Sequence, residues 1–343
     1  SINLFQNGTI FFIKCSSKSN ACTTVMSKII SETFDPNYCV IVDGGHDIAD
    51  FCLEERFDKI FYTGSPKIGV HVLENAAKNL TPVALELGGE TGNYCIIRKD
   101  ANIKDAAKKV AFFKILNAGQ ICININQVAV AEEIADQFIK ELKAQFIAQI
   151  GKDATLNIEY PKLISEGAYK NCEKEALKYK DRIVFGGFGD PDTLKFNPTI
   201  IYPVNQDEEI VNHELFNPLL PIIKYKDSEI NDLLNNIAKK EHGLALYIFT
   251  KDIKWAKSVM QSQQFGGGCI NEVCVHLMVK GVPFNGVGHS GMGQYHGEWG
   301  FKEFTHPQTV LFGKTHLNLP LRLHPFNGRK NEWKKKLIKK FIK

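Results

Sequence analysis

A cysteine behind a glycine turn and a glutamate within an apolar run are the two residues of this sequence that could carry out chemistry together. Cys122 ends the segment NAGQIC, and Glu86 lies in the run VALELGG. A thiol attacks a carbonyl carbon only as the thiolate, which favours a partly open loop, and Gly119 permits such a turn. Flanking leucines would desolvate the Glu86 carboxylate and raise its pKa, as suits a general base near neutral pH.

Each of these two residues also has a purely structural interpretation. Free cysteines are most often buried and behave as small hydrophobic residues. Strand alternation also allows Glu86 to lie on the exposed face of a half-buried strand. The two residues alone therefore leave both interpretations open.

The sequence motifs that contain and surround these two residues are more specific evidence. Five motifs occur in this order: FYTGS at 61–65, LELGG at 85–89, NAGQIC at 117–122, ELFNP at 214–218 and PFNGVGHSGMG at 283–293. Over roughly residues 8 to 325 the sequence resembles the aldehyde dehydrogenase superfamily, closest to its class 3 and fatty-aldehyde branch. Several ordered motifs are far more specific than any one of them.

The resemblance implies an α/β fold with a Rossmann-type cofactor domain, an α/β catalytic domain and C-terminal bridging elements. The expected parts are a cofactor-binding domain over 1–85, incomplete at its N-terminus, a catalytic domain over 86–298, a bridging or oligomerisation segment over 299–328 and a basic amphipathic tail over 329–343. The bridging elements imply a homodimer.

Cofactor contacts are expected at strand ends and in one later loop. Gly64 and Ser65 stand at a strand-to-helix turn, where backbone amides can approach a pyrophosphate. The resemblance implies that Glu214 bonds the nicotinamide ribose and that Phe216 packs against the cofactor. The complete predicted set is Lys14, Ser16, Gly64, Ser65, Gly69, Glu214 and Phe216. Ser17 replaces the glutamate of many NAD-preferring members, which removes repulsion against a 2′-phosphate, so NAD and NADP both stay open.

Hydrophobic periodicity predicts the elements that must position these groups. Strands are expected over 9–14, 38–42, 59–63, 83–89, 182–185 and 244–249, and helices over 20–32, 70–78 and 106–116. Ile134, Phe138, Leu142 and Phe146 recur every four residues and predict an amphipathic helix packed on the domain. Gly92 and Asn93 are expected in a loop, and the glycine-rich run 284–293 as a structural loop near the substrate mouth.

The sequence departs from the family pattern in several places. It opens with Ser1 rather than Met, and the Pro-Trp-Asn motif, whose asparagine helps to hold the oxyanion in the family, has no counterpart. Pro66 stands where threonine is usual, and Glu90 where lysine is usual. Two alternatives follow: the chain is a fragment, or the protein lacks part of the usual site.

Composition narrows the class of protein. No apolar run approaches the roughly 18 residues that span a bilayer, and no signal peptide is evident. Nine cysteines without a close-spaced framework favour a reducing compartment, so we expect a cytoplasmic protein, or one peripheral on an intracellular membrane. The sequence has no Cys-x-x-Cys pair, and His289, His296 and His306 lack helical ligand spacing, so no metal site is expected.

The last fifteen residues carry the basic character of the chain. Residues 329–343 hold eight Lys or Arg and one Glu, a local charge of +7 in a chain of +4, so the remainder carries −3. This balance argues against nucleic acid as a partner. Trp333, Leu337 and Phe341, spaced by four among lysines, predict a basic amphipathic helix. This helix could bind a membrane surface, remain a solvated charged tail, or pack over a neighbouring subunit.

The sequence therefore predicts NAD(P)-dependent oxidation of a medium- or long-chain aliphatic aldehyde to a carboxylic acid, through a cysteine thiohemiacetal and thioester. One alternative is a catalytically impaired relative with a membrane-surface or assembly role. Another is an acylating enzyme that passes the thioester to a thiol acceptor. Retention of Glu86, as a base for water, argues for hydrolysis.

Overall fold

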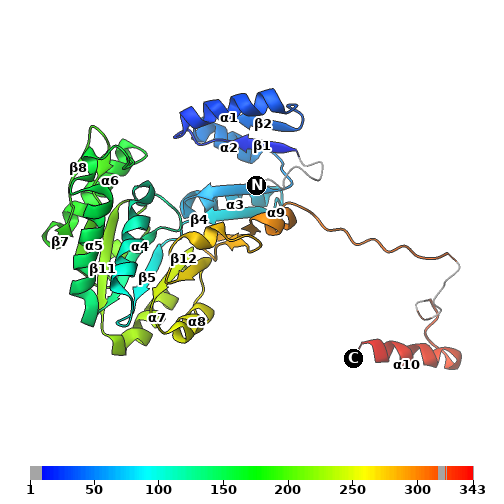
Figure 1. Cartoon of the computed structure of the whole chain (residues 1–343). Helices are drawn as coiled ribbons and strands as arrows, with labels where there is room; N and C mark the ends of the chain where they lie inside the picture. The colour runs from blue at the N-terminus through cyan, green and yellow to red at the C-terminus, as the bar shows by residue number, and fades with distance from the viewer. Residues whose placement is uncertain (1–9, 316–320, 322, 343) are drawn as a thin grey trace. The chain divides into compact units, whose positions relative to one another are not determined.

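The computed structural model describes residues 10–315, 321 and 323–342, and Figure 1 shows the chain. Contacts divide the chain into a first unit that ends at Thr305 and a second that begins at His306. The first unit contains the sheets and the candidate site, and the second contains the C-terminal helix.

The first elements form a small parallel sheet. Strand β1 (Phe11–Lys14) pairs with β2 (Cys39–Val42), and helix α1 (Asn20–Thr33) connects them. Helix α2 (His46–Glu54) follows. The predicted strand and helix are confirmed, although Thr9, at the start of the predicted strand, lies outside the described residues.

A second sheet carries Glu86. Strand β3 (Ile60–Gly64) runs parallel to β4 (Val83–Leu87), helix α3 (Pro66–Lys78) connects them, and β15 (Gly291–Met292) pairs antiparallel with the other edge of β4. Among the described residues, the cofactor-binding part therefore consists of two sheets rather than one continuous sheet.

The glycine-rich run differs from the expected loop. It forms two short strands, β14 (Phe284–Asn285) and β15. Strand β14 pairs with β16 (Gln294–Tyr295), and Gly291 of β15 stands directly opposite Glu86 of β4. The run therefore supports the strand that carries the predicted base.

A seven-stranded sheet forms the centre of the catalytic part. Its order is β13 (Gly267–Ile270), β12 (Ala245–Phe249), β5 (Asn93–Ile97), β6 (Ile125–Ala131), β11 (Leu219–Tyr225), β10 (Thr199–Val204) and β7 (Ile183–Phe185). Every neighbouring pair is parallel except β10 and β7. Such strands are apolar throughout because helices cover both faces. The loop predicted at Asn93 is wrong, because Asn93 begins β5 and is buried.

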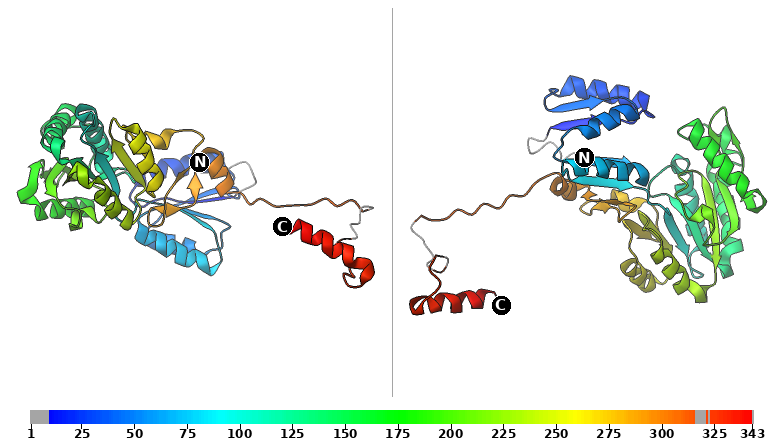
Figure 2. Two further views of the ribbon diagram at one scale, coloured as in Figure 1. Left: turned by 90° about the horizontal axis from the view of Figure 1, so that it is seen from below. Right: turned by 180° about the vertical axis from the view of Figure 1, so that it is seen from behind.

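Two buried clusters hold helices on opposite faces of this sheet (Figures 1 and 2). Helices α4 (Ile103–Ile115) and α5 (Ala135–Ile150) belong to one cluster. Helices α6 (Glu166–Lys178), α7 (Ile230–Lys239) and α8 (Ile253–Ser262) belong to the other. Phe138, Leu142 and Phe146 of α5 are fully buried, which confirms the predicted helix and its packing face. Helix α9 (Gly297–Glu303) ends the first unit.

The C-terminal unit contains the predicted helix, α10 (Glu332–Phe341). Its orientation is partly unexpected. Lys334, expected among the exposed lysines, is 7% exposed, and its ammonium donates hydrogen bonds to the Leu323 and Pro325 carbonyls at 3.0 and 3.3 Å. Trp333 and Leu337 are about half exposed, and the Phe341 side chain lies outside the described part. Within the described residues, the structure contains no helix of the length and apolarity that a membrane crossing requires.

Candidate active site

The turn that presents Cys122 has an unusual backbone. Asn117, Ala118 and Gly119 all lie in the left-handed region, with φ of 50°, 51° and 76°. A Cβ on Gly119 would lie 2.2 Å from the backbone oxygen of Asn217, so the turn requires glycine there. The Asn117 amide donates to the Gln120 carbonyl at 2.8 Å, which stabilises the turn from within.

The chain around the cysteine is also held from outside the turn. The side-chain amide of Asn93, at the start of β5, donates to the carbonyls of Cys122 and Asn124, both at 2.8 Å. The backbone N–H of Asn124 donates to the Ile121 carbonyl at 2.8 Å. Asn93 is therefore a structural support of the nucleophile, which explains why it lies in a buried strand rather than in a loop.

Glu86 and Cys122 meet in the interior. Glu86 is 3% exposed, and its carboxyl group and the Cys122 thiol are near enough for each to shift the pKa of the other. Burial raises the pKa of Glu86, while its interaction with the thiol opposes that rise. One carboxylate oxygen, Oε1, is buried and has no hydrogen-bond partner among the described residues. The predicted pair of nucleophile and base is thus adjacent in the structure.

The thiol itself is held in its protonated form. Burial, followed by the negative charges of Glu86 and Glu214, raises the pKa of Cys122, whereas the N–H of Ile123 lowers it. A thiol under these conditions is a poor nucleophile until its proton is taken. The carboxyl group of Glu86 lies near enough to affect the ionisation of this thiol.

Glu214 is a second carboxyl group of the site and is partly buried. A Cβ on Gly88 would lie 1.9 Å from Glu214 Oε1, so the carboxylate lies directly over the Gly88 backbone. Burial, then the charge of Glu86, raises the pKa of Glu214 to about 7. The N–H of Leu215 donates to Asn126 Oδ1 at 2.8 Å and fixes the loop. Sequence reasoning found Glu214 through its motif but did not predict its interaction with Glu86.

The next aromatic residue in that loop, Phe216, is 45% exposed and has φ of 47°, an uncommon backbone for an aromatic residue. Its ring therefore projects at the surface of the site region rather than into the core. That position is compatible with packing against a bound cofactor, which remains a prediction.

Tyr295 is a site residue that sequence reasoning missed. Burial, with the nearby Glu86 and Cys122, raises its pKa. Its ring packs edge-on against Phe284 at 5.4 Å and Phe61 at 5.1 Å between ring centroids. No local pattern marks this tyrosine, because it reaches the nucleophile only through the pairing of β14 with β16.

The start of α3 fits the anionic part of a nicotinamide dinucleotide. Ser65 is the N-cap of α3 and makes no side-chain capping hydrogen bond, and Pro66 at the first helical position has no N–H, so the N–H groups of Lys67 and Ile68 are the first-turn donors that this cap leaves available. Gly64 pairs with Leu87, which places this helix start beside Gly88, where Glu214 lies. The region from the start of α3, past Gly88, to Cys122 therefore suits an extended cofactor. Gly64, Ser65 and Glu214 would hold it.

The structure places the remaining predicted cofactor residues elsewhere. Lys14 and Ser16 follow β1 in the separate two-stranded sheet, where the Lys14 ammonium donates to the Gly44 carbonyl at 2.7 Å. Gly69 is buried within α3, and a Cβ there would lie 3.0 Å from the Leu87 side chain, so this glycine permits close packing of helix and strand. Their contacts with a cofactor stay predictions.

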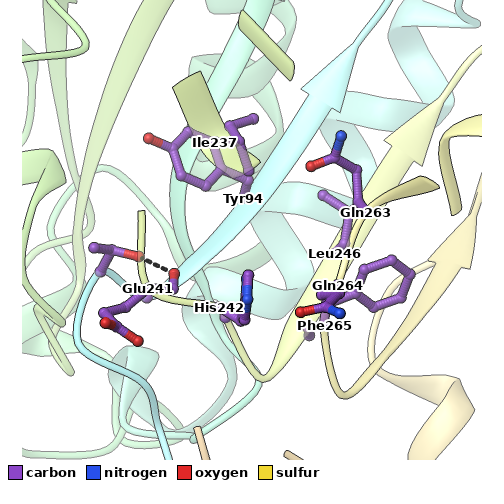
Figure 3. A pocket seen from close by; sticks show the side chains of 12 residues that line it. Tyr94, Ile237, Glu241, His242, Leu246, Gln263, Gln264 and Phe265 are labelled. Atoms are coloured by element: carbon purple, nitrogen blue, oxygen red, sulfur yellow. Dashed lines mark hydrogen bonds between the residues drawn. The ribbon is translucent and has the colours of Figure 1, made fainter. Parts of the chain in front are cut away.

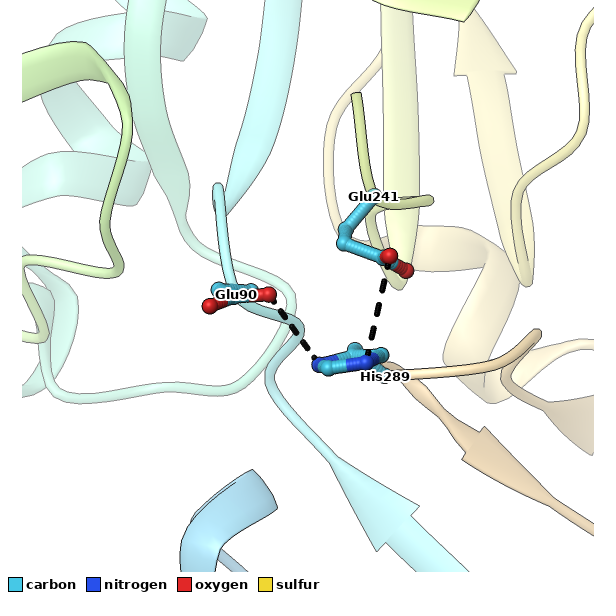
Figure 4. A group of neighbouring side chains, drawn as sticks. All are labelled: Glu90, Glu241 and His289. Atoms are coloured by element: carbon cyan, nitrogen blue, oxygen red, sulfur yellow. Dashed lines mark ion pairs between the residues drawn. The ribbon is translucent and has the colours of Figure 1, made fainter. Parts of the chain in front are cut away.

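An exposed cluster of charged side chains lies at three loops (Figure 4). His289 pairs with Glu90 at 3.1 Å and with Glu241 at 3.8 Å, and the ligand atoms of all three lie within 4.8 Å of one another. The sequence predicted ordinary polar contacts for His289, and its ion pairs agree with that. The convergence itself was missed because the three residues are distant in sequence.

A pocket beside this cluster is separate from the catalytic pair. Figure 3 shows its lining at the starts of β5 and β12, where Tyr94, Leu246 and Phe265 supply apolar walls. Glu241 belongs to both the pocket and the charged cluster, and its backbone oxygen accepts a hydrogen bond from Thr91 at 3.0 Å. Neither Cys122 nor Glu86 lines this pocket.

A buried lysine lies behind the catalytic turn. Lys114, on α4, is 1% exposed, and its Nζ donates to the Ile125 carbonyl at 2.9 Å. Burial lowers the pKa of Lys114 to about 7, and a nearby cysteine of α6, Cys172, acts in the opposite direction. Lys114 also lines a small cavity together with Glu214. Among buried positions lysine is rare, so this residue requires a reason.

Removing the charge of Glu86 should make Cys122 easier to ionise. In Glu86→Gln, the pH midpoint for alkylation of Cys122 by iodoacetamide should fall by about one unit or more, because a neighbouring negative charge is lost. Mass spectrometry of the Cys122 peptide measures the extent of alkylation between pH 6 and 10 and so gives the midpoint. Glu90→Gln, at an exposed glutamate of the same segment, is the matched control. An unchanged or higher midpoint in Glu86→Gln would contradict the assignment.

Lys114 should make stability depend on pH. Its pKa falls from 10.5 in the unfolded chain to about 7 in the fold, so the unfolded chain binds more protons between these values and the fold loses stability as pH falls. At about 1.4 kcal/mol per pKa unit, the wild type should lose about 2 kcal/mol relative to Lys114→Met between pH 9.5 and 7.5.

Urea unfolding at both pH values measures this difference. Lys108→Met, at an exposed lysine of the same helix, should leave the pH dependence of the wild type unchanged. A constant free-energy difference between the wild type and Lys114→Met at the two pH values would show that the buried amine does not titrate in this window.

Comparisons with known proteins agree with the site. The model of the Aldehyde dehydrogenase family matches residues 5–310. The chain is 34% identical, over 342 residues, to 4,4′-diaponeurosporen-aldehyde dehydrogenase of Staphylococcus aureus, and the match covers 100% of this chain and 72% of the relative. It is 33% identical to aldehyde dehydrogenase family 3 member A2 of Mus musculus, covering 98% of this chain and 69% of the relative.

Solved structures show the same fold. The substrate-bound state of Staphylococcus aureus AldH has a TM-score of 0.91 at 33% identity, covering 97% of this chain and 71% of that one. The Mycobacterium tuberculosis aldehyde dehydrogenase complexed with NAD+ has a TM-score of 0.79 at 25% identity, covering 90% and 64%. The chain thus spans between about two thirds and three quarters of these proteins.

The predicted family and fold class are therefore confirmed, and so is a dinucleotide, NAD or NADP, as the cofactor type. The paired thiol and carboxyl group, the uncapped helix start and the family match all lead to one conclusion: the chain belongs to the aldehyde dehydrogenase family, and its similarity extends to the class 3 branch.

Proposed function

We propose that this chain oxidises a medium- or long-chain aliphatic aldehyde to its carboxylic acid, with Cys122 as the nucleophile and Glu86 as the base. The observation that carries the proposal is the 3% exposed Glu86 carboxyl group beside the partly buried Cys122 thiol, each of which shifts the pKa of the other. Buried thiols in a structural role have no need of a desolvated carboxyl partner.

The first step uses the pair directly. Glu86 takes the thiol proton as Cys122 Sγ bonds to the aldehyde carbon, and the carbonyl oxygen becomes the oxyanion of a thiohemiacetal. Backbone N–H groups next to Cys122 donate to that oxyanion. The left-handed turn and the Asn93 amide keep these backbone groups in place. A bound NAD or NADP supplies the hydride acceptor that converts the adduct to a thioester.

Hydrolysis uses Glu86 again. After the proton taken from the thiol has passed to bulk solvent, the Glu86 carboxylate removes a proton from water, the hydroxide oxygen bonds to the thioester carbon, and the carbon–sulfur bond breaks to release the acid. The Cys122 thiolate then regains a proton from Glu86. The raised pKa of Glu86 suits this exchange of protons near neutral pH. Glu214 stays beside Gly88, where we assign it to the cofactor ribose.

An apolar substrate is supported by side chains near Tyr295. Val275, Met278, Val279 and Val282 are at least 42% exposed and follow one another on the segment before β14. His276 of the same segment stacks on Phe284, and Phe284 packs on Tyr295 beside the catalytic pair. Exposed apolar patches commonly mark binding sites for apolar groups.

Turnover assays test the proposal with the polypeptide as it occurs naturally. Reduced nicotinamide should form from a long-chain aldehyde faster than from a short-chain one, with NAD and NADP run in parallel. Cys122→Ala should lose activity. Glu86→Gln should form the acyl-enzyme more slowly, because the thiol lacks its base, and should then stall with the acyl group retained on Cys122 by mass spectrometry, because the water also lacks its base.

Two outcomes would contradict the proposal. Wild-type turnover retained by Cys122→Ala would exclude the nucleophile. A folded wild type that turns over no aldehyde with either cofactor would favour the alternative of a catalytically impaired relative with a membrane-surface or assembly role. A homodimer stays a prediction of the family resemblance.

We also propose that the C-terminal unit binds an anionic membrane surface. Lys335, Lys336, Lys339 and Lys340 of α10 accompany the half-exposed Trp333 and Leu337. Basic and apolar side chains on one amphipathic helix suit the headgroup region of a bilayer. Lys334 does not contribute, because it is bonded to carbonyls of its own unit.

Vesicle sedimentation tests this binding. Replacing the four lysines by alanine should weaken binding to phosphatidylserine vesicles about a hundredfold or more, since each basic residue near the surface contributes about 1 kcal/mol. Alanine at Lys140, Lys170, Lys174 and Lys254, all exposed on the first unit, is the matched control. Equal sedimentation of both variants with the wild type would exclude the tail as the anchor.

A further inference from the structure

The loop that carries Cys122 is closed at its base by two side chains. Helix α4 ends at Ile115 and strand β6 begins at Ile125, and the nucleophile lies on the chain between them. Asn124, just before β6, donates through its amide to the Phe113 carbonyl at 2.5 Å. Lys114 donates to the Ile125 carbonyl at 2.9 Å. We call these two reciprocal hydrogen bonds the clasp.

The clasp completes a series of held carbonyls. The Ile121 carbonyl accepts from the Asn124 N–H, and those of Cys122 and Asn124 accept from the Asn93 amide. The carbonyl of Ile123 accepts from the hydroxyl of Tyr247 at 2.8 Å. With the Lys114 bond, every carbonyl from residue 121 to 125 has a donor. Such complete satisfaction leaves the backbone of the nucleophile little freedom.

We propose that Lys114 is a positioning residue for Cys122: as an uncharged amine, it closes the base of the loop together with Asn124 and fixes the backbone that presents the thiol. The expected effect of Lys114 on turnover rests on the proposed aldehyde oxidation. The claim that Lys114 fixes the backbone of the loop does not depend on that reaction.

The surroundings of Lys114 favour an uncharged amine. The ammonium form has three N–H donors, whereas the structure gives Nζ one acceptor, the Ile125 carbonyl. The titratable group that interacts with it is Cys172 of α6, itself fully buried, and Glu214 borders the same small cavity. A buried charge without a paired counter-ion is strongly unfavourable, so the neutral form is selected.

The contacts of Lys114 favour a role through the backbone. Its Nζ donates to the carbonyl of Ile125, three residues beyond Cys122, whereas the largest influences on the ionisation of Cys122 are burial and the charges of Glu86 and Glu214. Lys114 therefore acts on the thiol through the backbone. Its four-carbon stem reaches from α4 to the first residue of β6, a span that methionine can fill without supplying the N–H donor.

Lys114→Met tests the proposal, with Lys108→Met of the same helix as control. We expect kcat to fall tenfold or more while KM for the cofactor stays within twofold, since small displacements of a reacting group are costly. Alkylation of Cys122 by iodoacetamide, in the absence of substrate and cofactor, should be at least threefold faster because the loop opens more readily. Lys108→Met should match the wild type in each measurement.

Thermal unfolding near pH 7 separates positioning from general stability. Lys114→Met should unfold at the same or a higher temperature than the wild type, because the cost of burying an amine is removed, and yet be slower in turnover. A variant with wild-type kcat and wild-type alkylation would overturn the proposal. If Lys114→Met does not fold, Lys114→Leu, also without a donor, is judged by the same measurements.

The experiment distinguishes a failure of the proposed aldehyde oxidation from a failure of the proposed role of Lys114. If the wild type oxidises no aldehyde, alkylation still compares the loop in the wild type, Lys114→Met and Lys108→Met. Faster alkylation in Lys114→Met alone would then support the clasp without the reaction, and equal alkylation in all three would overturn it.

Discussion

The candidate site depends on one desolvated interaction, that of the Cys122 thiol with the Glu86 carboxyl group. In the interior, where charges interact strongly, neither group ionises easily while the other is charged. The pair is therefore stable as a neutral thiol and becomes reactive only when a proton moves. The surrounding architecture keeps the two groups together.

Two separate parts of the fold provide this arrangement. Strand β4 supplies Glu86 and is held between β3 and the late strand β15, so segments more than two hundred residues apart fix the base. The turn after α4 supplies Cys122. The Asn117 side chain stabilises the left-handed residues, and the Asn93 amide holds the Cys122 carbonyl. Glu214 lies between the helix start of α3 and the pair, which suits one cofactor in contact with all three.

Residues that act through local patterns could be predicted from the sequence, and those that act through tertiary contacts could not. Cys122, Glu86 and Gly64 lie in short motifs whose turn and strand signals are local. Tyr295 has no such signal because strand pairing brings it to the site, and Lys114 has none because its sequence context is that of an ordinary helical lysine. Asn93 was placed in a loop because a Gly-Asn pair favours turns, whereas its buried amide is required by two carbonyls of the nucleophile segment.

Burial acts on the two signs of charge in opposite directions, and the site uses both effects. It raises the pKa of Glu214 to about 7 and lowers that of Lys114 to about 7, so near neutral pH both groups are substantially uncharged. A permanently charged lysine here would stabilise ionised carboxylates and lower the pKa of Glu86, which would make it a weaker base. The uncharged amine supplies a hydrogen-bond donor without that field. The region around Cys122 can therefore be rigid and still leave the charge of the reaction to the thiol and its base.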